Sequence, residues 1–338
     1  MNLISEDVNL IVSSLLNEGI SFDKQNVLVT GGAGFLGSWT CETLLGLGAR
    51  VFCLDNLSSG RLSNLERIIG DRNFSYINHD ISNPFFPDKQ IDLILHLASR
   101  ASPLEFSRYP IQILKANTLG TWVTLGIAKK CNSRYVLAST SEVYGDPPAK
   151  NVPTPETYNG NVNPIGARSC YDESKRVAEA FTMAYHNQHE LDTRIMRIFN
   201  TYGPRMRGGD VYGRVVSRFI EQALLNKPIT IFGDGNQTRT FTYVSDLIKG
   251  LIKTAFLPDI SGQVFNIGGQ GETTILALAN LIKQLSGTTS EITYQSLPPD
   301  DPKRRCPDTS KAVNILNWNA EISLRKGLEK TVLWHNQC

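Results

Sequence analysis

The feature that most constrains the fold is a short apolar segment, residues 26–30, that runs straight into the glycine-rich turn Gly31-Gly-Ala-Gly-Phe-Leu-Gly37. A helical stretch follows the turn and reaches Leu47. Strand, glycine turn and helix in this order are the fingerprint of dinucleotide binding. The glycines permit the turn, let the backbone approach a pyrophosphate and let helix and strand pack closely, and the helix N-terminus then faces the phosphates.

A second strand is predicted at residues 50–55, and it ends on Asp55. A carboxylate at this place binds the adenosine ribose hydroxyls and repels a 2′-phosphate, so NAD is favoured over NADP. The ends of the next strands should line the same crevice. We therefore predict that NAD contacts Gly31, Gly34, Phe35, Leu36, Gly37, Asp55, Asn56, Ser58, Asp80, Ile81, Leu97, Ala98, Ser99, Tyr171 and Lys175.

Strands and helices alternate along the first two hundred residues. Further strands are predicted at residues 74–78, 91–96, 134–138 and 193–198, with a long amphipathic helix at 111–130. Such alternation predicts an α/β protein with a doubly wound (Rossmann) parallel sheet covered by helices on both faces.

The pattern loosens after residue 200, where prolines and glycines cluster. We predict three parts: an N-terminal helical extension at 1–24, a Rossmann NAD-binding domain at 25–200, and a smaller mixed α/β substrate-binding domain at 201–338. Parts of about 240–270 should pack back on the Rossmann domain. The extension is acidic and lacks the positive cluster of a signal peptide.

Composition excludes several classes of partner. With 34 basic and 32 acidic residues, the net charge of +2 gives no electrostatic argument for nucleic acid or a membrane surface. No apolar run approaches the ~20 residues that span a bilayer. The six cysteines are scattered without a Cys-x-x-Cys pair, which is typical of free thiols in a reducing, cytoplasmic compartment. His186 and His189 lack acidic or cysteine partners nearby, so no metal site is expected.

Tyr171 and Lys175 lie four residues apart, on one face of a predicted helix. Tyrosine titrates near pH ~10, and a lysine ammonium held close lowers that pKa and makes a usable base. Alone the pair is weak evidence, since the spacing occurs on many solvated helices. Thr140, at the end of a predicted strand, completes a hydride-transfer site. It can bond a sugar hydroxyl, Tyr171 can remove its proton, and Lys175 can bind the nicotinamide ribose.

Longer motifs make the chain resemble a known family. They are Leu-Ala-Ser-Thr-Ser-Glu-Val-Tyr-Gly-Asp at 137–146, Ser-Cys-Tyr-Asp-Glu at 169–173, Arg-Ile-Phe-Asn-Thr-Tyr-Gly-Pro-Arg-Met at 197–206, Gly-Arg-Val-Val-Ser at 213–217 and Asp-Asp-Pro-Lys-Arg-Arg at 300–305. With these motifs the chain resembles the extended short-chain dehydrogenases that act on nucleotide sugars, and among them the UDP-glucuronate decarboxylases, from about residue 25 to 335.

The resemblance implies a reaction with retained NAD: oxidation at C4 of UDP-glucuronate, loss of carbon dioxide from the 4-keto sugar, and re-reduction to UDP-xylose. The implied catalytic residues are Thr140, Ser141, Glu142, Tyr171, Lys175 and Arg305. The implied substrate-binding residues are Arg100, Phe106, Asn200, Arg214, Arg239 and Arg305. Family members are usually homodimers, joined through helices here at about 111–130 and 171–188.

Three alternative functions use the same fold. Dehydratases of this fold place an Asp-Glu pair after the threonine, and Ser141 stands in the aspartate's place, which argues against water loss. A 4-epimerase of a UDP-uronic acid stays open, because it needs only the oxidation and a rotating keto intermediate. A non-catalytic NAD-binding scaffold is also open, although Thr140, Tyr171 and Lys175 argue against it.

The loop after the fourth strand departs from the family pattern. Arg100 stands where the family usually has proline, and Phe106 where it has tyrosine. Either these are neutral changes, with Arg100 facing solvent, or they indicate an altered sugar or nucleotide that still carries a carboxylate. The loop at 207–212 also looks slightly longer than in the family.

Overall fold

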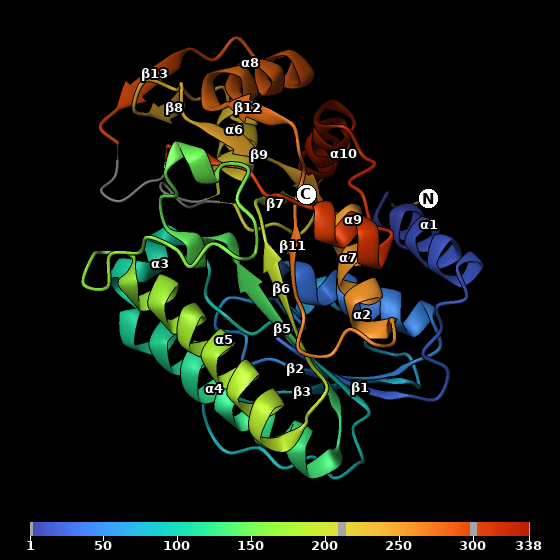
Figure 1. Cartoon of the computed structure of the whole chain (residues 1–338). Helices are drawn as coiled ribbons and strands as arrows, with labels where there is room; N and C mark the ends of the chain where they lie inside the picture. Colours follow the sequence, from blue (N-terminus) through green and yellow to red (C-terminus); the bar gives the residue numbers. More distant parts are fainter. Residues whose placement is uncertain (1–2, 209–213, 298–302, 338) are drawn as a thin grey trace.

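The computed structural model describes residues 3–208, 214–297 and 303–337. Most of the 207–212 loop, Gly213 and the start of the 300–305 motif lie outside this range. At the centre is a seven-stranded sheet in the order β11-β6-β5-β4-β1-β2-β3 (Figure 1). Every pairing is parallel, so the predicted doubly wound sheet is confirmed. Its strands are β1 (Asn26–Thr30), β2 (Arg50–Leu54), β3 (Phe74–Ile77), β4 (Leu93–His96), β5 (Arg134–Thr140), β6 (Thr193–Ile198) and β11 (Val264–Ile267).

Helices cover both faces of this sheet (Figure 1). α4 (Pro110–Cys131) and α5 (Ser169–His189) pack together on one face, while α2 (Phe35–Gly46), α7 (Val244–Phe256) and α1 (Leu3–Asn17) pack on the other. Strand β1 shows why both faces close: Leu28 joins the apolar cluster under α4 and α5, and Val27 and Val29 join the cluster under α2 and α7. Alternate residues of a strand point to opposite faces, so a continuous apolar strand needs a cover on each.

The strand order reverses beside β1, and this positions the site. β2 lies on one side of β1 and β4 on the other, so the loops after β1 and β4 diverge and leave a crevice at their carboxyl ends. The first turn of α2 and the loop after β4 both open onto that crevice.

Smaller sheets and helices of the second half stand above the carboxyl end of the main sheet (Figure 1). β8 (Ile229–Phe232) pairs with β13 (Ile292–Gln295), β7 (Thr201–Tyr202) with β10 (Thr242–Tyr243), and β9 (Thr238–Thr240) with both β12 (Glu272–Thr274) and β14 (Arg304–Arg305). The helices there are α6 (Val215–Leu224), α8 (Ile275–Ser286) and α10 (Leu324–Gln337), whereas α9 (Ser310–Leu316) packs beside β11 and α7. β11 belongs to the main sheet, whereas the division into domains at residue 200 stays a prediction.

The extension at the N-terminus is a helix, α1, fastened by a buried carboxylate. Asp7 accepts a hydrogen bond of 2.7 Å from the Tyr243 hydroxyl and pairs with Lys330 of α10. One face of the helix, which includes Ile11 and Leu15, enters the core. Helix α1 therefore packs against α2 and α7 beside the main sheet, and its Asp7 contacts Tyr243 and α10 of the second half of the chain.

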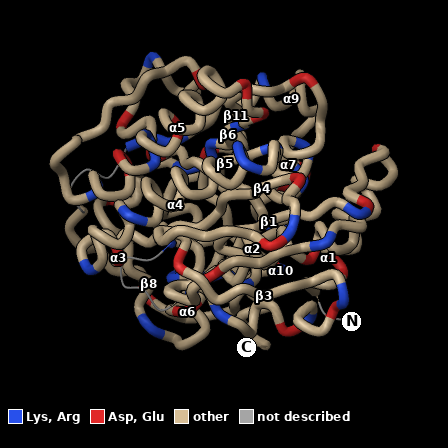
Figure 2. Tube along the Cα trace, turned by 90° about the horizontal axis from the view of Figure 1, so that it is seen from below, with Lys and Arg blue, Asp and Glu red and all other residues tan. Residues whose placement is uncertain are grey.

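Charges of both signs are interspersed over the trace (Figure 2). Five cysteines lie in the described ranges, and all five are buried and outside any disulfide. In the same ranges, no helix has the length and apolar character needed to cross a bilayer. No group of three or more histidine, cysteine or acidic side chains there could hold a metal ion.

Candidate active site

The sequence-predicted residues come together in one cavity of about 1540 Å³ at the carboxyl end of the sheet. All of the residues predicted to bind NAD, to contact the substrate or to take part in catalysis line it. Its lining includes Asp55 and Asp80, the glycine turn, Tyr171, and Arg239 of the second half of the chain.

The glycine turn is shaped by two close approaches. Gly31 has a φ of +70°, and a Cβ there would lie 2.8 Å from the Cα of Ala98 on the neighbouring loop. A Cβ on Gly37 would lie 2.1 Å from the carbonyl oxygen of Gly31. Neither contact is possible for a larger residue, because real Cβ atoms do not approach so closely. Glycine therefore lets α2 start directly against β1.

Asp55 is fixed at the end of β2 by backbone amides. Its carboxylate accepts hydrogen bonds from the amide of Ala33, at 3.0 Å, and of Leu57, at 2.7 Å. Burial raises the pKa of Asp55, and these two amides act against that rise. Asp80 accepts from both the amide and the hydroxyl of Ser82. Its pKa is lowered: burial acts to raise it, but the hydrogen bonds from Ser82 outweigh this effect.

The residues at this end fit a dinucleotide. Gly34 caps α2 without a side-chain hydrogen bond, so the first amides of the helix point to the cavity. The hydroxyl of Ser99 is buried and has no hydrogen-bond partner among the described residues. A buried hydroxyl without a partner is costly, and a bound polar group would satisfy it. Asp55, Ser99 and the start of α2 would hold the ribose and phosphates of NAD.

Tyr171 and Lys175 lie on the first turns of α5, and both are buried. Burial, and then the charge of Glu142, raises the pKa of Tyr171 to about 12, against the effect of the Thr140 hydroxyl. Burial lowers the pKa of Lys175 to about 8. The Lys175 ammonium donates a hydrogen bond of 2.9 Å to the carbonyl of Ala138. The lowered Tyr171 pKa expected from the sequence is therefore not found, because burial and the Glu142 carboxylate raise it, and the Lys175 ammonium donates to the Ala138 carbonyl.

Glu142 lies between two arginines. Arg305 reaches it from β14 with both guanidinium nitrogens, one of them 2.8 Å from Oε2, and Arg168 donates to the same Oε2 at 2.5 Å. Burial alone would raise the pKa of Glu142, but the two cations lower it to about 2. Glu142 is thus ionised throughout the physiological range, next to Ser141 and Thr140.

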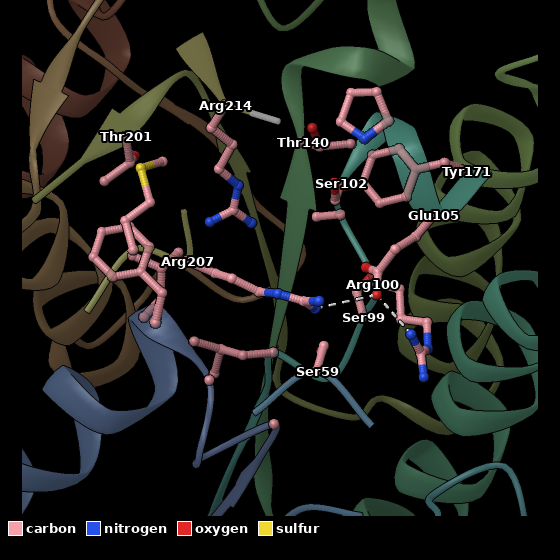
Figure 3. A pocket seen from close by; sticks show the side chains of 18 of the residues that line it. Ser59, Ser99, Arg100, Ser102, Glu105, Thr140, Tyr171, Thr201, Arg207 and Arg214 are labelled. Carbon is pink, nitrogen blue, oxygen red and sulfur yellow. Dashed lines mark hydrogen bonds and ion pairs between the residues drawn. The ribbon is translucent and has the colours of Figure 1, made fainter. Parts of the chain in front are cut away.

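A small sheet places two of the predicted arginines side by side. Arg239 of β9 and Arg305 of β14 are register partners in a parallel pairing, and both are buried. Asn200 follows β6 and donates through its side chain to the carbonyl of Thr240, at 3.3 Å. Arg214, just before α6, extends into the cavity (Figure 3). Its guanidinium lies 5.9 Å from the ring centre of Phe35.

The loop after β4 carries an ion-pair cluster. Glu105 accepts from Arg100 at 2.6 Å and contacts Arg207 at 3.5 Å. Figure 3 shows Arg207 extending across the cavity toward Glu105 on the opposite wall. Arg100 also stacks 4.6 Å from the ring centre of Tyr109. The Arg100 side chain therefore forms part of the cavity wall, packed against Glu105 and Tyr109, and does not extend into open solvent.

Phe106 covers the predicted base. Its ring stacks on Tyr171 with the ring centres 4.9 Å apart and an angle of 14° between the planes. The guanidinium of Arg168 lies 5.6 Å from the centre of the Phe106 ring. Phe106 thus contributes an apolar wall that keeps water from Tyr171.

Sequence reasoning missed four charged residues of the site: Arg168, Asp172, Glu105 and Arg207. One signal was present, since Arg168 and Asp172 are spaced i,i+4 around Tyr171, as helical ion pairs are. No local pattern points to Glu105 and Arg207, which meet only across the cavity.

Comparison with known proteins identifies the family. Residues 27–268 match the NAD dependent epimerase/dehydratase family. This span covers well over half of the chain, and the chain therefore belongs to the NAD dependent epimerase/dehydratase family.

The similar sequences agree with the predicted subgroup. The chain is 48% identical over 310 residues to "UDP-glucuronic acid decarboxylase 1" of Xenopus tropicalis, covering 92% of this chain and 72% of that protein. It is 46% identical over 317 residues to "UDP-glucuronic acid decarboxylase 6" of Arabidopsis thaliana, covering 94% and 90%.

Solved structures share the fold at lower identity. UDP-glucuronic acid 4-epimerase from Bacillus cereus, solved with UDP-glucuronic acid and NAD, superposes with a TM-score of 0.83 at 29% identity, covering 93% of this chain and 99% of that one. UDP-glucose 4-epimerase from Thermotoga maritima, solved with UDP-glucose, gives 0.84 at 30%, with the same coverage.

Proposed function

We propose that the protein is an NAD-dependent carboxy-lyase that converts UDP-glucuronate to UDP-xylose. The observation that carries this proposal is the bidentate pairing of Arg305 with Glu142, two residues after Thr140 and in the same cavity as Tyr171. In this pairing the guanidinium of Arg305, which belongs to the second half of the chain, binds the carboxylate of Glu142 within the cavity. A planar guanidinium pairs with carboxylates in this fork geometry, so Arg305 suits the uronate carboxylate.

The chain's own residues divide the work in the proposed reaction. Thr140 and Tyr171 would hold the C4 hydroxyl, and Tyr171 would take its proton. The chemistry that NAD supplies when bound is removal of the hydride from C4 and its later return. With C4 a ketone, the carboxylate lies β to a carbonyl, so the bond to carbon dioxide can break and leave its electron pair in an enolate. Ser141, Glu142 and Arg305 would orient the carboxyl end, and a proton then adds at C5.

Arg214, Arg239 and Asn200 would bind the diphosphate of the substrate. The two arginines belong to the second half of the chain and line the same cavity as Tyr171. Arginine forks pair with phosphate oxygens as well as with carboxylates. A nucleotide sugar would therefore enter from the second half of the chain and meet the nicotinamide at Tyr171.

A 4-epimerase of a UDP-uronic acid is the second candidate, favoured by the likeness to the Bacillus cereus enzyme. The test is incubation of the purified protein with UDP-glucuronate. We expect carbon dioxide and a UDP-pentose, with a fall of at least about 10²-fold in rate for Tyr171→Phe, since general base catalysis contributes that much. UDP-galacturonate without carbon dioxide would establish the epimerase instead, and no turnover would leave a scaffold role.

A homodimer and a cytoplasmic location complete the proposal. Large apolar side chains lie exposed on the paired helices α4 and α5, namely Ile111, Leu119, Trp122 and Val177. A neighbouring copy that packed two more helices there would bury them. The five buried thiols suit a reducing compartment.

A further inference from the structure

Four charged side chains form a continuous series beside Tyr171. Arg305 pairs with Glu142, Glu142 with Arg168 at 2.5 Å, and Arg168 with Asp172, whose Oδ2 lies 3.7 Å from Nε. The series holds two guanidinium groups and two carboxyl groups, so it is neutral when both acids are ionised. It connects β14, the turn after β5 and the first turn of α5.

Of the two carboxyl groups in this series, that of Asp172 has the weaker contacts with the arginines. It is 6% exposed, and its Oδ1 is buried without a hydrogen-bond partner in the described part of the chain. Burial, and then the charge of Glu142, raises its pKa to about 7, against Arg168 and Arg305. The titratable or charged groups around it are Glu142, Arg168, Cys170, Tyr171, Glu173 and Arg305.

A substrate carboxylate would upset the neutrality of the series. To reach Arg305 it must share or displace Glu142, which already engages both terminal nitrogens of the guanidinium. Arg214 and Arg239 would be engaged by the diphosphate of the same substrate, so three carboxylates would then share the two guanidinium groups of the series, and buried excess charge is strongly unfavourable. A group in this position is neutralised by proton uptake, and the proton goes to the acid that holds its charge least well.

We propose that Asp172 takes up one proton when a carboxylate-bearing nucleotide sugar binds, while Arg168 keeps Glu142 ionised and in place. The inference rests on the proposed function. Asp172 is thus a positioning residue: it acts through Arg168 and lets a third carboxyl group enter the series without net charge. A sugar nucleotide with a neutral sugar should cause no such uptake.

Calorimetry can count the proton. A Tyr171→Phe background prevents turnover, and UDP-glucuronate is titrated at about pH 8 in two buffers of different ionisation enthalpy. We expect uptake of about one proton in this background and close to none when Asp172→Asn is added. Asparagine keeps the size and an oxygen for Arg168 but cannot titrate. UDP-glucose, which lacks the carboxylate, is the matched ligand control.

The proposal would be overturned if the Tyr171→Phe protein took up no proton, or if it took up as many protons as the Tyr171→Phe/Asp172→Asn protein. It would also be overturned if UDP-glucose caused the same proton uptake as UDP-glucuronate. Should the double variant not fold, the unsubstituted enzyme decides. Its KM for UDP-glucuronate should rise up to about tenfold per pH unit above pH ~7, and a flat profile would contradict the inference. If the unsubstituted enzyme releases carbon dioxide but the Tyr171→Phe protein takes up no proton on binding UDP-glucuronate, this inference alone is refuted. If the unsubstituted enzyme releases no carbon dioxide, the proposed function is refuted.

Discussion

The cofactor end of the cavity is made of backbone and of two carboxylates held by hydrogen bonds, whereas the substrate end is made of charged side chains from separate segments. Gly31 follows β1, Gly37 lies in the first turn of α2, and Asp55 follows β2, so all three belong to one short stretch of the chain. Glu142, Arg168 and Arg305 come from three elements that are far apart in the chain. The first end depends on close approach of backbone atoms, and the second on the balance of buried charges.

This difference predicts different kinds of failure. A substitution at the cofactor end should change packing and stability, because there is no room for added atoms. A substitution at the substrate end should change rate, affinity and pH dependence, because it leaves a buried charge without its counterion.

The largest effect is expected for Arg305. Arg305→Met should lower kcat/KM for UDP-glucuronate about 10²- to 10³-fold, since it removes a charge-assisted donor from the site. The adjacent Arg304 is a matched control: it is exposed and pairs with Glu272, away from Glu142. Arg304→Met should change kcat/KM less than about threefold, within the range of a surface ion pair. Similar losses in both variants would show that charge in this segment, rather than the Glu142 pairing, matters.

Gly37→Ala tests the cofactor end. Its Cβ would clash with the Gly31 carbonyl, so we expect a loss of at least about 3 kcal/mol in the free energy of unfolding, together with loss of bound NAD. Gly70→Ala is the control, because no atom lies within 4 Å of its added Cβ. The measurements are chemical denaturation and the NAD content of the purified protein. A Gly37→Ala protein with normal stability would contradict the close packing of α2 on the turn.

The smallest effect is expected in the loop after β4. The double variant Arg100→Pro/Phe106→Tyr removes the Arg100 pairing with Glu105 and adds a hydroxyl at the Tyr171 stack. If these residues adapt the site to another uronic acid, the variant should improve kcat/KM for UDP-glucuronate, by roughly tenfold for one added hydrogen bond. Unchanged kinetics would show that both replacements are neutral for this substrate.

Much of the fold follows from local sequence patterns. Strands of the main sheet are short apolar runs, and β1 and β6 begin and end where their residues predict. The three-stranded sheet of β9, β12 and β14 was not predicted. Its strands have two or three residues, too few for any periodicity, and they pair across long separations in the chain.

In the site, too, residues within one local sequence pattern were predicted, and residues that meet only across distant segments were not predicted from such a pattern. The glycine turn and Asp55 could be assigned from one contiguous stretch, because backbone geometry restricts the residues allowed there. Arg305 was assigned only through a family motif, and Glu105 not at all, since ion pairs between distant segments leave no local trace. The pKa of Tyr171 was expected to fall because the sequence shows its lysine neighbour but not the depth of its burial.

The pairing of β9 with β14 has a consequence for substrate size. Arg239 and Arg305 sit on adjacent strands in register, and neighbouring strands lie about 4.8 Å apart. If Arg239 holds a phosphate and Arg305 a sugar carboxylate, the backbone hydrogen bonds of this small sheet keep the bases of the two side chains at a constant separation. The spacing of the two anions in the substrate would then be measured from one rigid pair of strands, so a shorter link between phosphate and carboxylate would engage one of the two arginines less well.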